Sequence, residues 1–370
     1  MGDIDDTTVR TVVRTALGRP DAEVDRWDAA PTGFVVDNMT TERLDRVCGT
    51  LTDGTPWSLF AKTLRPASAS PRWAMIPPFA HATVLRELDW LDEPRVYRSG
   101  LAADLPPGIR LPHLWHVEEG DDRIVLWMED VTDRAVWSPD TYRRAAEGLG
   151  RLAGRWPEDR VRGELGLRRR QLAEYADVKV TGAVLPRLRD DATWSDPLVA
   201  AATAHDPGLR TDLERLADDL PALVAMADAG PCVLGHGDPA PANILDDGTD
   251  LVLVDWSYGA TMAAGLDLAQ LVAGAVDGRL VCDVDLVAAA DGLVAEAYCA
   301  GLASEGVAVP HADVERSYLI ALAVRSGLSA VDVSHAADLP EEHRAALLAQ
   351  RTGLARRALD RLAAVSPPRA

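Results

Sequence analysis

Cysteine is scarce in this chain, and its four residues are widely spaced. Cys48, Cys232, Cys282 and Cys299 form no Cys-x-x-Cys pair, which disfavours both a disulfide framework and a zinc site. The chain begins Met1-Gly-Asp-Ile-Asp-Asp6, without the apolar stretch of a signal peptide, and its longest apolar runs are too short to span a bilayer. We therefore expect a cytoplasmic protein with no membrane partner.

Positive charge is also in short supply. Lys and Arg together number 38 against 58 Asp and Glu, which gives a formal net charge of −20 at pH 7. This excess disfavours nucleic acid or an anionic membrane as the main partner, and it is compatible with a cationic substrate. An acidic surface that only aids solubility explains the same charge equally simply.

The length of 370 residues predicts two lobes. We place the first at residues 1–130, because β-prone stretches broken by Gly and Asp alternate there with few helices. The second lobe, residues 131–370, is mostly helical by its apolar periodicity. The class is α+β, with a small β-rich N-terminal lobe, one important helix in it, and a larger helical C-terminal lobe.

Individual elements of both lobes follow from the same patterns. The first lobe is predicted to hold a helix at residues 7–17, a hairpin of Arg46–Leu51 and Trp57–Leu64 around Asp53-Gly54, a helix at 83–91 and a strand at Arg123–Met128. Helices of the second lobe are predicted at residues 142–156, 168–175, 211–226, 265–275, 284–302, 314–328 and 341–364.

One segment of the second lobe carries most of the chemistry. Val233-Leu-Gly-His-Gly-Asp-Pro-Ala-Pro-Ala-Asn-Ile-Leu245 is followed by the apolar strand Leu251-Val-Leu-Val-Asp-Trp256. Asp238 lies in a tight loop, where it can accept or orient a hydroxyl proton. Asn243 and Asp255 offer hard oxygen ligands to Mg²⁺. This spacing predicts phosphoryl transfer from a nucleotide, and we expect His236 to brace the loop through hydrogen bonds.

Lysine is the rarest charged residue, which singles out Lys62. Only Lys62 and Lys179 stand against thirty-six arginines. An ammonium on a predicted strand is a compact charge that fits between phosphate oxygens, where a planar guanidinium does not substitute well. Glu87, on the following helix, is the expected carboxylate partner of Lys62. Glu93 competes for this role, but it precedes Pro94 at the predicted helix end.

Two further positions have open interpretations. Asp267 begins a predicted helix, where it either favours the positive end of the helix dipole or accepts hydrogen bonds from the catalytic loop. The segment from Thr32-Gly33 to Thr41 is the candidate phosphate-covering loop, with Gly33 as its single glycine. The sequence contains neither Gly-x-Gly-x-x-Gly here nor any Gly-Lys dipeptide, which excludes a P-loop. Glu129 and Val131, after the last strand, could pair with adenine through their backbone.

The segments that contain these residues resemble those of a known family. His236-Gly-Asp-Pro-Ala-Pro-Ala-Asn243 and Val254-Asp-Trp256 resemble the Brenner-type motif and the metal-binding Asp of the aminoglycoside phosphotransferase/choline kinase family. The resemblance extends to Lys62, Glu87, the linker Met128-Glu-Asp130 and Asp267. It implies a protein-kinase-like bilobal fold, with a nucleotide in the cleft between the lobes and Mg²⁺ beside it.

The resemblance also implies roles for single residues. Asp238 is the catalytic base, Asn243 and Asp255 hold Mg²⁺, and Lys62 contacts the nucleotide phosphates, while Glu129 and Val131 bind adenine through the backbone. Trp256 stands where protein kinases carry the Phe of Asp-Phe-Gly. Because no Ala-Pro-Glu-like activation segment follows, we do not expect a protein substrate.

The sequence leaves the identity of the acceptor molecule open. Family members place acceptor-site helices in the region corresponding to residues 158–230, which here contains acidic side chains, the run Arg168-Arg-Arg170 and the aromatic residues Tyr175 and Trp194. The leading expectation is ATP-dependent phosphorylation of a hydroxyl on a small, possibly amino-bearing antibiotic of the aminoglycoside type. A metabolic kinase for choline, a sugar, homoserine or methylthioribose is the alternative, as is a pseudokinase that binds nucleotide without turnover. GTP is an alternative donor, and the oligomeric state is not predicted.

Overall fold

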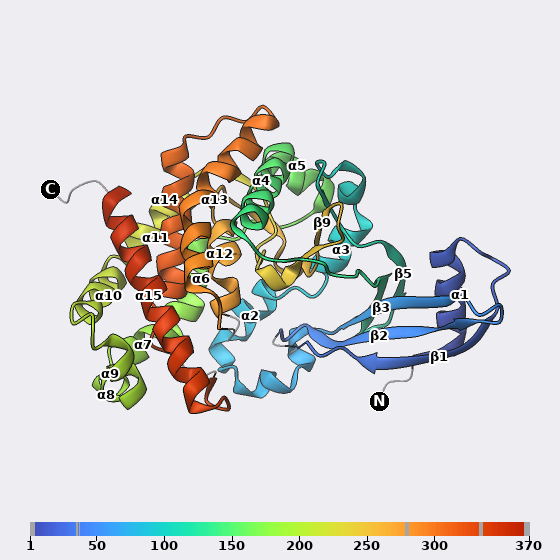
Figure 1. Cartoon of the computed structure of the whole chain (residues 1–370), viewed down its shortest axis with the longest axis horizontal. Helices are drawn as coiled ribbons and strands as arrows, with labels where there is room; N and C mark the ends of the chain where they lie inside the picture. The colour runs from blue at the N-terminus through green and yellow to red at the C-terminus, as the bar shows by residue number, and fades with distance from the viewer. Residues whose placement is uncertain (1–3, 35, 37, 278–280, 333–335, 366–370) are drawn as a thin grey trace.

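A computed structural model describes residues 4–34, 36, 38–277, 281–332 and 336–365. A β-sheet lobe lies beside a larger helical lobe (Figure 1). The sheet has five antiparallel strands in the order β1-β2-β3-β6-β5. Their bounds are Val24–Pro31 for β1, Thr41–Leu51 for β2, Pro56–Leu64 for β3, Leu114–Glu119 for β5 and Ile124–Glu129 for β6.

The two faces of this sheet have different partners. Helix α1 (Asp6–Leu17) begins at the N-cap Asp5 and ends at Gly18, and its Val9, Val12 and Val13 pack on one face of the sheet. The predicted helix at residues 7–17 and the predicted hairpin of β2 and β3 are confirmed. Side chains on the other face, such as Leu64, belong to the core of the large lobe. The side chain of Lys62 shares this face, because alternate residues of a strand point the same way.

The chain between β3 and β5 departs from expectation. The predicted helix at residues 83–91 is instead a short α2 (His81–Glu87) followed by α3 (Asp92–Arg98). Pro94 is the third residue of α3, where a helix tolerates proline because the first-turn amides have no intrahelical acceptor. Proline therefore marks the beginning of a helix here and not its end. This places Glu93 in the first turn of α3.

Helices make up most of the chain from residue 139 onward. The long ones are α4 (Pro139–Arg155), α10 (Leu209–Asp218), α12 (Asp267–Asp277), α13 (Val284–Ser304), α14 (His311–Leu322) and α15 (Glu341–Val365). Shorter ones are α5 (Glu158–Arg160), α6 (Leu172–Tyr175), α7 (Leu185–Leu188), α8 (Asp191–Ser195), α9 (Pro197–Thr203) and α11 (Leu220–Asp228), and π-helical turns occupy Val161–Leu165, Ala176–Val184 and Ala323–Gly327. The prediction of a β-rich N-terminal lobe and a helical C-terminal lobe is confirmed. The boundary between them at residue 130 stays a prediction.

Two predicted helices are shorter in the structure. The stretch 211–226 is divided into α10 and α11 at Asp219, and Pro221 in the first turn of α11 explains the break because it cannot extend a preceding helix. The stretch 168–175 is helical only from Leu172, since Arg169 forms a β-bridge with Thr261.

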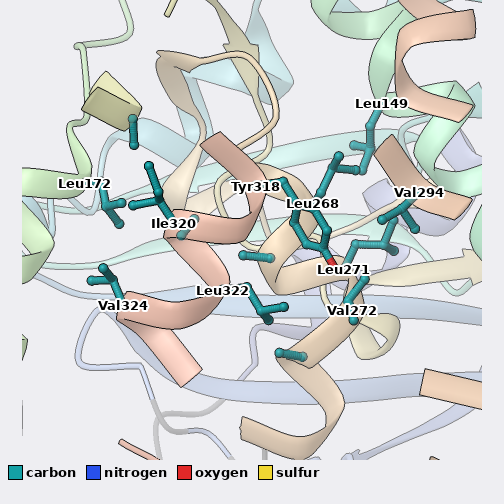
Figure 2. Close-up of a cluster of buried hydrophobic side chains, with 14 of the residues drawn as sticks. Leu149, Leu172, Leu268, Leu271, Val272, Val294, Tyr318, Ile320, Leu322 and Val324 are labelled. Carbon is teal, nitrogen blue, oxygen red and sulfur yellow. The ribbon is translucent and has the colours of Figure 1, made fainter. Parts of the chain in front are cut away.

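The core of the large lobe forms around α12. Figure 2 shows Leu268, Leu271 and Val272 of α12 among side chains of the neighbouring helices, including Val294 of α13 and Tyr318 of α14. Leu268, Leu271 and Val272 are fully buried. Burial of this kind stabilises the lobe by about 1.5 to 3 kcal/mol for each large apolar side chain. Helix α12 is therefore anchored in the core of the large lobe.

Helices α4 and α13 approach each other unusually closely. A Cβ on Gly150 of α4 would overlap the carbonyl oxygen of Tyr298, and one on Gly301 of α13 would overlap that of Glu147. By length and composition α13 could also cross a membrane, contrary to the expectation from the sequence, and among the described residues it is the one helix that passes this test. Half of the apolar stretch of α13 is buried in the large lobe, and its apolar side chains therefore suit a core helix.

Two small sheets hold the segment that carries the chemistry. Strand β7 (Cys232–Gly235) pairs with β10 (Ala260–Ala263), and β8 (Ile244–Asp246) pairs with β9 (Leu251–Leu253). The edge of the second sheet is β4 (Ile109–Arg110), which runs parallel to β9. A short turn joins β8 to β9, and the two strands of this hairpin carry Asn243 at the start of one and Asp255 after the end of the other.

Candidate active site

The loop that carries Asp238 turns sharply after β7. Gly237 has a φ of +84°, and a Cβ on it would overlap the carbonyl oxygen of Tyr258. Only glycine adopts this conformation without strain and fits in this space. Tyr258 belongs to the 3₁₀ turn Trp256–Tyr258 that follows β9. The glycine therefore lets the loop lie directly on the segment that carries Asp255.

His236 braces the loop from within, as expected. Its ring is completely buried, and Nε2 lies 3.0 Å from the carbonyl oxygen of Val254. On the other side of the ring, Nδ1 accepts a 3.4 Å hydrogen bond from the amide of Asp238. Both contacts suit a neutral imidazole with its proton on Nε2, and burial lowers the pKa of His236. A catalytic role for His236 beyond this support stays a prediction.

Asp267 holds the backbone of the same loop. Its two carboxylate oxygens accept hydrogen bonds from the amides of His236, at 2.8 Å, and Gly237, at 2.9 Å. Asp267 therefore does accept hydrogen bonds from the catalytic loop, which is one of its two interpretations from the sequence. Asp267 is also the first residue of α12, so both interpretations describe it. Burial raises the pKa of its carboxyl, although the hydrogen bonds from these two amides work in the opposite direction.

Asp238 is held by two amide side chains. Asn243 Nδ2 donates to Asp238 Oδ2 at 3.1 Å and to the Asp238 carbonyl at 2.9 Å. Gln270 Nε2 donates to Asp238 Oδ1 at 2.8 Å. Burial raises the pKa of Asp238, and the hydrogen bond from Gln270 opposes that shift. The sequence did not reveal Gln270, whose only signal is its place three residues after Asp267 on a helix.

Asn243 and Asp255 stand at the same end of the β8–β9 hairpin. Asn243 immediately precedes β8, and its carbonyl accepts a 3.0 Å hydrogen bond from the amide of Val254. Asp255 has a φ of 60°, and it is the one non-glycine residue of the described ranges in the left-handed region. Such a conformation costs about 1 to 3 kcal/mol and is found mainly at functional sites. The fold tolerates it at the position that turns this carboxylate toward Lys62.

These two side chains fit a divalent cation. Because Asn243 uses Nδ2 to hold Asp238, its Oδ1 faces away from that bond, and no hydrogen bond to Oδ1 occurs within the described part of the chain. Asp255 is one-third exposed. Burial acts to raise the pKa of Asp255, but Lys62 outweighs it and lowers the pKa, so the carboxylate is ionised. Across the described ranges no cluster of three His, Cys, Asp or Glu side chains could hold a metal, and Mg²⁺ commonly takes few protein ligands alongside nucleotide phosphates.

Lys62 reaches this site from the sheet, but its partner is not the expected one. Its Nζ lies 2.8 Å from Asp255 Oδ1 and 2.7 Å from Glu93 Oε2. Burial opposes the charge on Lys62, but Asp255 and Glu93 outweigh it and raise the pKa of the ammonium. Burial raises the pKa of Glu93 to about 7. Two carboxylates thus share one ammonium, and Asp255 keeps its charge more firmly than Glu93.

The predicted ion pair between Lys62 and Glu87 is wrong. Glu87 accepts two hydrogen bonds from Arg168, at 2.6 and 3.1 Å. The error follows from the division of the predicted helix into α2 and α3. Glu87 is the last residue of α2, whereas Glu93 in the first turn of α3 is only 1% exposed and reaches the ammonium. The partner of Lys62 is thus Glu93, the competing candidate from the sequence.

The expected nucleotide loop is only partly described. It joins β1 to β2, Gly33 within it is exposed, and Val35 and Asp37 lie outside the described residues. Asn38 connects the loop to the site, since its Nδ2 donates to Ser257 Oγ at 3.2 Å. A role for Gly33 in covering phosphates stays a prediction.

At the end of β6, the backbone amide of Glu129 is hydrogen-bonded and that of Val131 has no partner among the described residues. The amide of Glu129 donates to the carbonyl of His113 at 2.8 Å, and the Glu129 carboxylate pairs with Arg110. No hydrogen bond of the Val131 amide occurs within the ranges that the structure describes. The Val131 amide is therefore the better placed of the two for an adenine edge, and adenine binding at both residues stays a prediction.

Most acidic side chains of residues 158–230 have structural partners. Glu164 pairs with Arg160, Glu174 lies 3.5 Å from Arg168, Asp191 pairs with Arg210, and Asp190 and Asp196 cap α8 and α9. Trp156 is completely buried, and Trp194 donates its indole N–H to the Leu188 carbonyl. Tyr175 differs from these, because its ring lies under the guanidinium of Arg325, 4.5 Å from the centroid. Arg325 in turn donates to Gln270, beside Asp238.

Comparison with known proteins supports the fold. No protein-family model and no curated protein matches the sequence. Among solved structures, the chain is similar to spectinomycin phosphotransferase in complex with ADP and spectinomycin, with a TM-score of 0.52 and 11% identity over 96% of this chain and 98% of that one. It is also similar to a choline/ethanolamine kinase family protein from Mesorhizobium loti, with a TM-score of 0.48 and 18% identity over 98% and 95%. A putative aminoglycoside phosphotransferase from Ralstonia eutropha gives 0.49 and 11% over 95% and 98%.

The first of these similarities spans nearly the whole of both chains. The protein has the bilobal α+β fold of the protein-kinase-like class, as the sequence predicted. At 11% identity, the likeness to spectinomycin phosphotransferase shows the fold alone.

Proposed function

We propose that this protein is a small-molecule kinase that transfers the γ-phosphate of ATP to a hydroxyl group of its acceptor. The observation that carries the proposal is the convergence of Asp238, Asn243, Asp255 and Lys62 from two lobes. Lys62 bonds to Asp255, and Asn243 bonds to Asp238, while the backbone bond from the Val254 amide to the Asn243 carbonyl holds the two pairs on one hairpin. Asp255 also has the left-handed conformation that is found mainly at functional sites.

Each side chain has a distinct task in this proposal. Asp238 accepts the hydrogen bond of the acceptor hydroxyl and orients its oxygen toward the γ-phosphorus. Asn243 Oδ1 and Asp255 would hold Mg²⁺, which supplies positive charge to the phosphate oxygens when bound. Lys62 adds a second positive charge, and Glu93 keeps it beside Asp255. Asp267 and His236 fix the loop, so that Asp238 needs little reorganisation during the reaction.

For the acceptor we propose one leading class and several alternatives. An amino-bearing antibiotic of the aminoglycoside type is our leading candidate, because the sequence motif resembles the family of these enzymes. Choline, a sugar, homoserine and methylthioribose are the metabolic alternatives. The donor is ATP, with GTP as the alternative, and the expected location is cytoplasmic. None of these assignments requires nucleic acid or a membrane.

The test is acceptor-dependent release of ADP by the purified protein with Mg²⁺-ATP. The acceptor panel holds aminoglycosides, spectinomycin, choline, ethanolamine, sugars, homoserine, methylthioribose and basic peptide antibiotics, and each is repeated with GTP and with excess EDTA. We expect turnover with one class, and its loss with EDTA. In Asp238→Ala we expect turnover to vanish while nucleotide binding, followed by calorimetry, persists.

Asp360→Ala is the matched control, since this carboxylate is two-thirds exposed on α15. It should turn over like the wild type. Nucleotide binding without turnover across the whole panel would favour a pseudokinase. Normal turnover in Asp238→Ala would remove Asp238 from its assigned role.

A further inference from the structure

One face of helix α12 lies against the catalytic loop at three successive points. Asp267, Gln270 and Gly274 follow the helical spacing i, i+3, i+7, which places them on one side of the helix. Asp267 bonds to loop amides, and Gln270 bonds to the carboxylate of Asp238. A Cβ on Gly274 would lie 2.5 Å from the Cβ of Ala240 and 3.0 Å from its Cα. The small residues at 240 and 274 thus allow the close approach that brings Gln270 within reach of Asp238.

The amide of Gln270 is itself oriented by its two partners. Nε2 donates to Asp238 Oδ1 at 2.8 Å, and Oε1 accepts from Arg325 Nε at 3.3 Å. A carboxylate can only accept and a guanidinium can only donate, so the reverse orientation of the amide would lose both bonds. Stacking of Arg325 on the Tyr175 ring holds the guanidinium in turn.

The carboxylate of Asp238 is consequently fixed from two sides. Asn243 holds Oδ2 from the loop, and Gln270 holds Oδ1 from α12. With one of these donors removed, the carboxylate could rotate about its side-chain bonds. Loss of a donor to a carboxylate at a reacting centre commonly misplaces it, and small misplacements reduce turnover strongly.

We propose that Gln270 is a positioning residue for phosphoryl transfer, which acts through Asp238 and is kept in orientation by Arg325. This inference rests on the proposed kinase activity for its consequence in turnover. The geometric part, that Gln270 sets the direction of the Asp238 carboxylate, does not depend on the activity.

The decisive variant is Gln270→Met, which keeps the length of the side chain and removes its hydrogen bonds. Crystal structures of the wild type and of this variant would be compared at the Asp238 side chain. We expect the carboxylate to rotate away from its contact with Asn243. With the acceptor found above, we expect kcat to fall roughly tenfold to a hundredfold. KM for Mg²⁺-ATP should stay within about twofold, because the side-chain hydrogen bonds of Gln270 within the described residues go to Asp238 and Arg325.

Two companion variants separate positioning from general stability. Gln350→Met makes the same chemical change on α15, where the buried Gln350 bonds to the backbone of Cys282. It should lower the melting temperature and leave kcat unchanged. Gln270→Glu should be at least as damaging to kcat as Gln270→Met, because its carboxylate would face Asp238 and could not donate.

Each outcome decides the inference. An unmoved Asp238 carboxylate in Gln270→Met would overturn it, and so would wild-type kcat in that variant or in Gln270→Glu. If the wild-type protein showed no turnover at all, the proposed function would fail, while the crystal comparison would still decide whether Gln270 directs Asp238.

Discussion

The identity of the carboxylate that pairs with Lys62 gives the sharpest prediction. Glu93 and Glu87 lie six positions apart, and only one of them contacts the ammonium. Glu93→Gln and Glu87→Gln make the same chemical change without creating a cavity. They therefore form a matched pair, in which the burial and the partner of each residue determine the expected size of the effect.

The environments of the two residues differ enough to separate their effects on stability. Lys62 is 4% exposed and Glu93 is 1% exposed, and removing one partner of a buried ion pair costs about 3 to 5 kcal/mol. Asp255 still holds Lys62 in Glu93→Gln, so we expect the lower end, about 3 kcal/mol. The pair of Glu87 with Arg168 is about one-fifth exposed at both side chains, and we expect about 1 kcal/mol from its loss.

These energies convert to distinguishable melting temperatures. At about 2.1 cal/mol/K per residue, a chain of 370 residues has an unfolding entropy of about 0.8 kcal/mol/K. Glu93→Gln should therefore melt about 4 °C below the wild type, and Glu87→Gln about 1 °C below it. Differential scanning calorimetry measures both shifts directly.

Turnover should separate the variants further. Without Glu93, the ammonium of Lys62 is drawn toward Asp255 alone, which places it against the proposed metal ligand. We expect kcat/KM for Mg²⁺-ATP to fall at least about tenfold in Glu93→Gln, and to stay within about threefold in Glu87→Gln. A greater loss in Glu87→Gln than in Glu93→Gln, in stability or in turnover, would refute the reasoning.

Three further predictions concern the catalytic loop. Gly237→Ala should lose at least about 2 kcal/mol of stability, because it combines strain at a φ of +84° with overlap on the Tyr258 carbonyl, and urea unfolding would measure it. Asp267→Ala leaves two amides without an acceptor and should cost about 2 kcal/mol together with most of kcat, whereas equal turnover would show that the loop needs no such support. His236 has a pKa held below its ordinary 6.5 by burial, so the unfolded chain binds its proton more readily than the folded one. The stability from this group should be full above pH 6.5 and be lost as the pH falls below it; His236→Gln should weaken that part of the pH dependence of the urea midpoint, and an unchanged profile would contradict the assignment.

The sequence was sufficient for the residues that lie within one local motif. Asp238, Asn243 and Asp255 follow from the spacing of a loop and a hairpin, which is set by the chain itself over eighteen positions. Lys62 followed from the rarity of lysine in an arginine-rich chain. These residues meet in the structure because β3 faces the hairpin, and that meeting is what the fold adds.

The sequence was insufficient where tertiary packing overrides a local pattern. Pro94 reads as a helix end when apolar spacing continues up to Leu91, yet it lies in the first turn of a new helix, and this reversed the choice between Glu87 and Glu93. Gln270 gave no signal beyond its place three residues after Asp267, since a single polar residue on an apolar helix is common at a surface. Its role depends on the close contact of Gly274 with Ala240, which no periodicity encodes.

Helix α12 lies between the core and the catalytic loop, and this position limits the substitutions that it can tolerate. Leu268, Leu271 and Val272 bury one side of the helix in the core (Figure 2). Asp267, Gln270 and Gly274 lie against the catalytic loop. Little of its surface is left on which a substitution would be neutral. We therefore expect substitutions on α12 to be rarely neutral under selection. Attempts to stabilise the large lobe by repacking α12 should alter turnover in the same step.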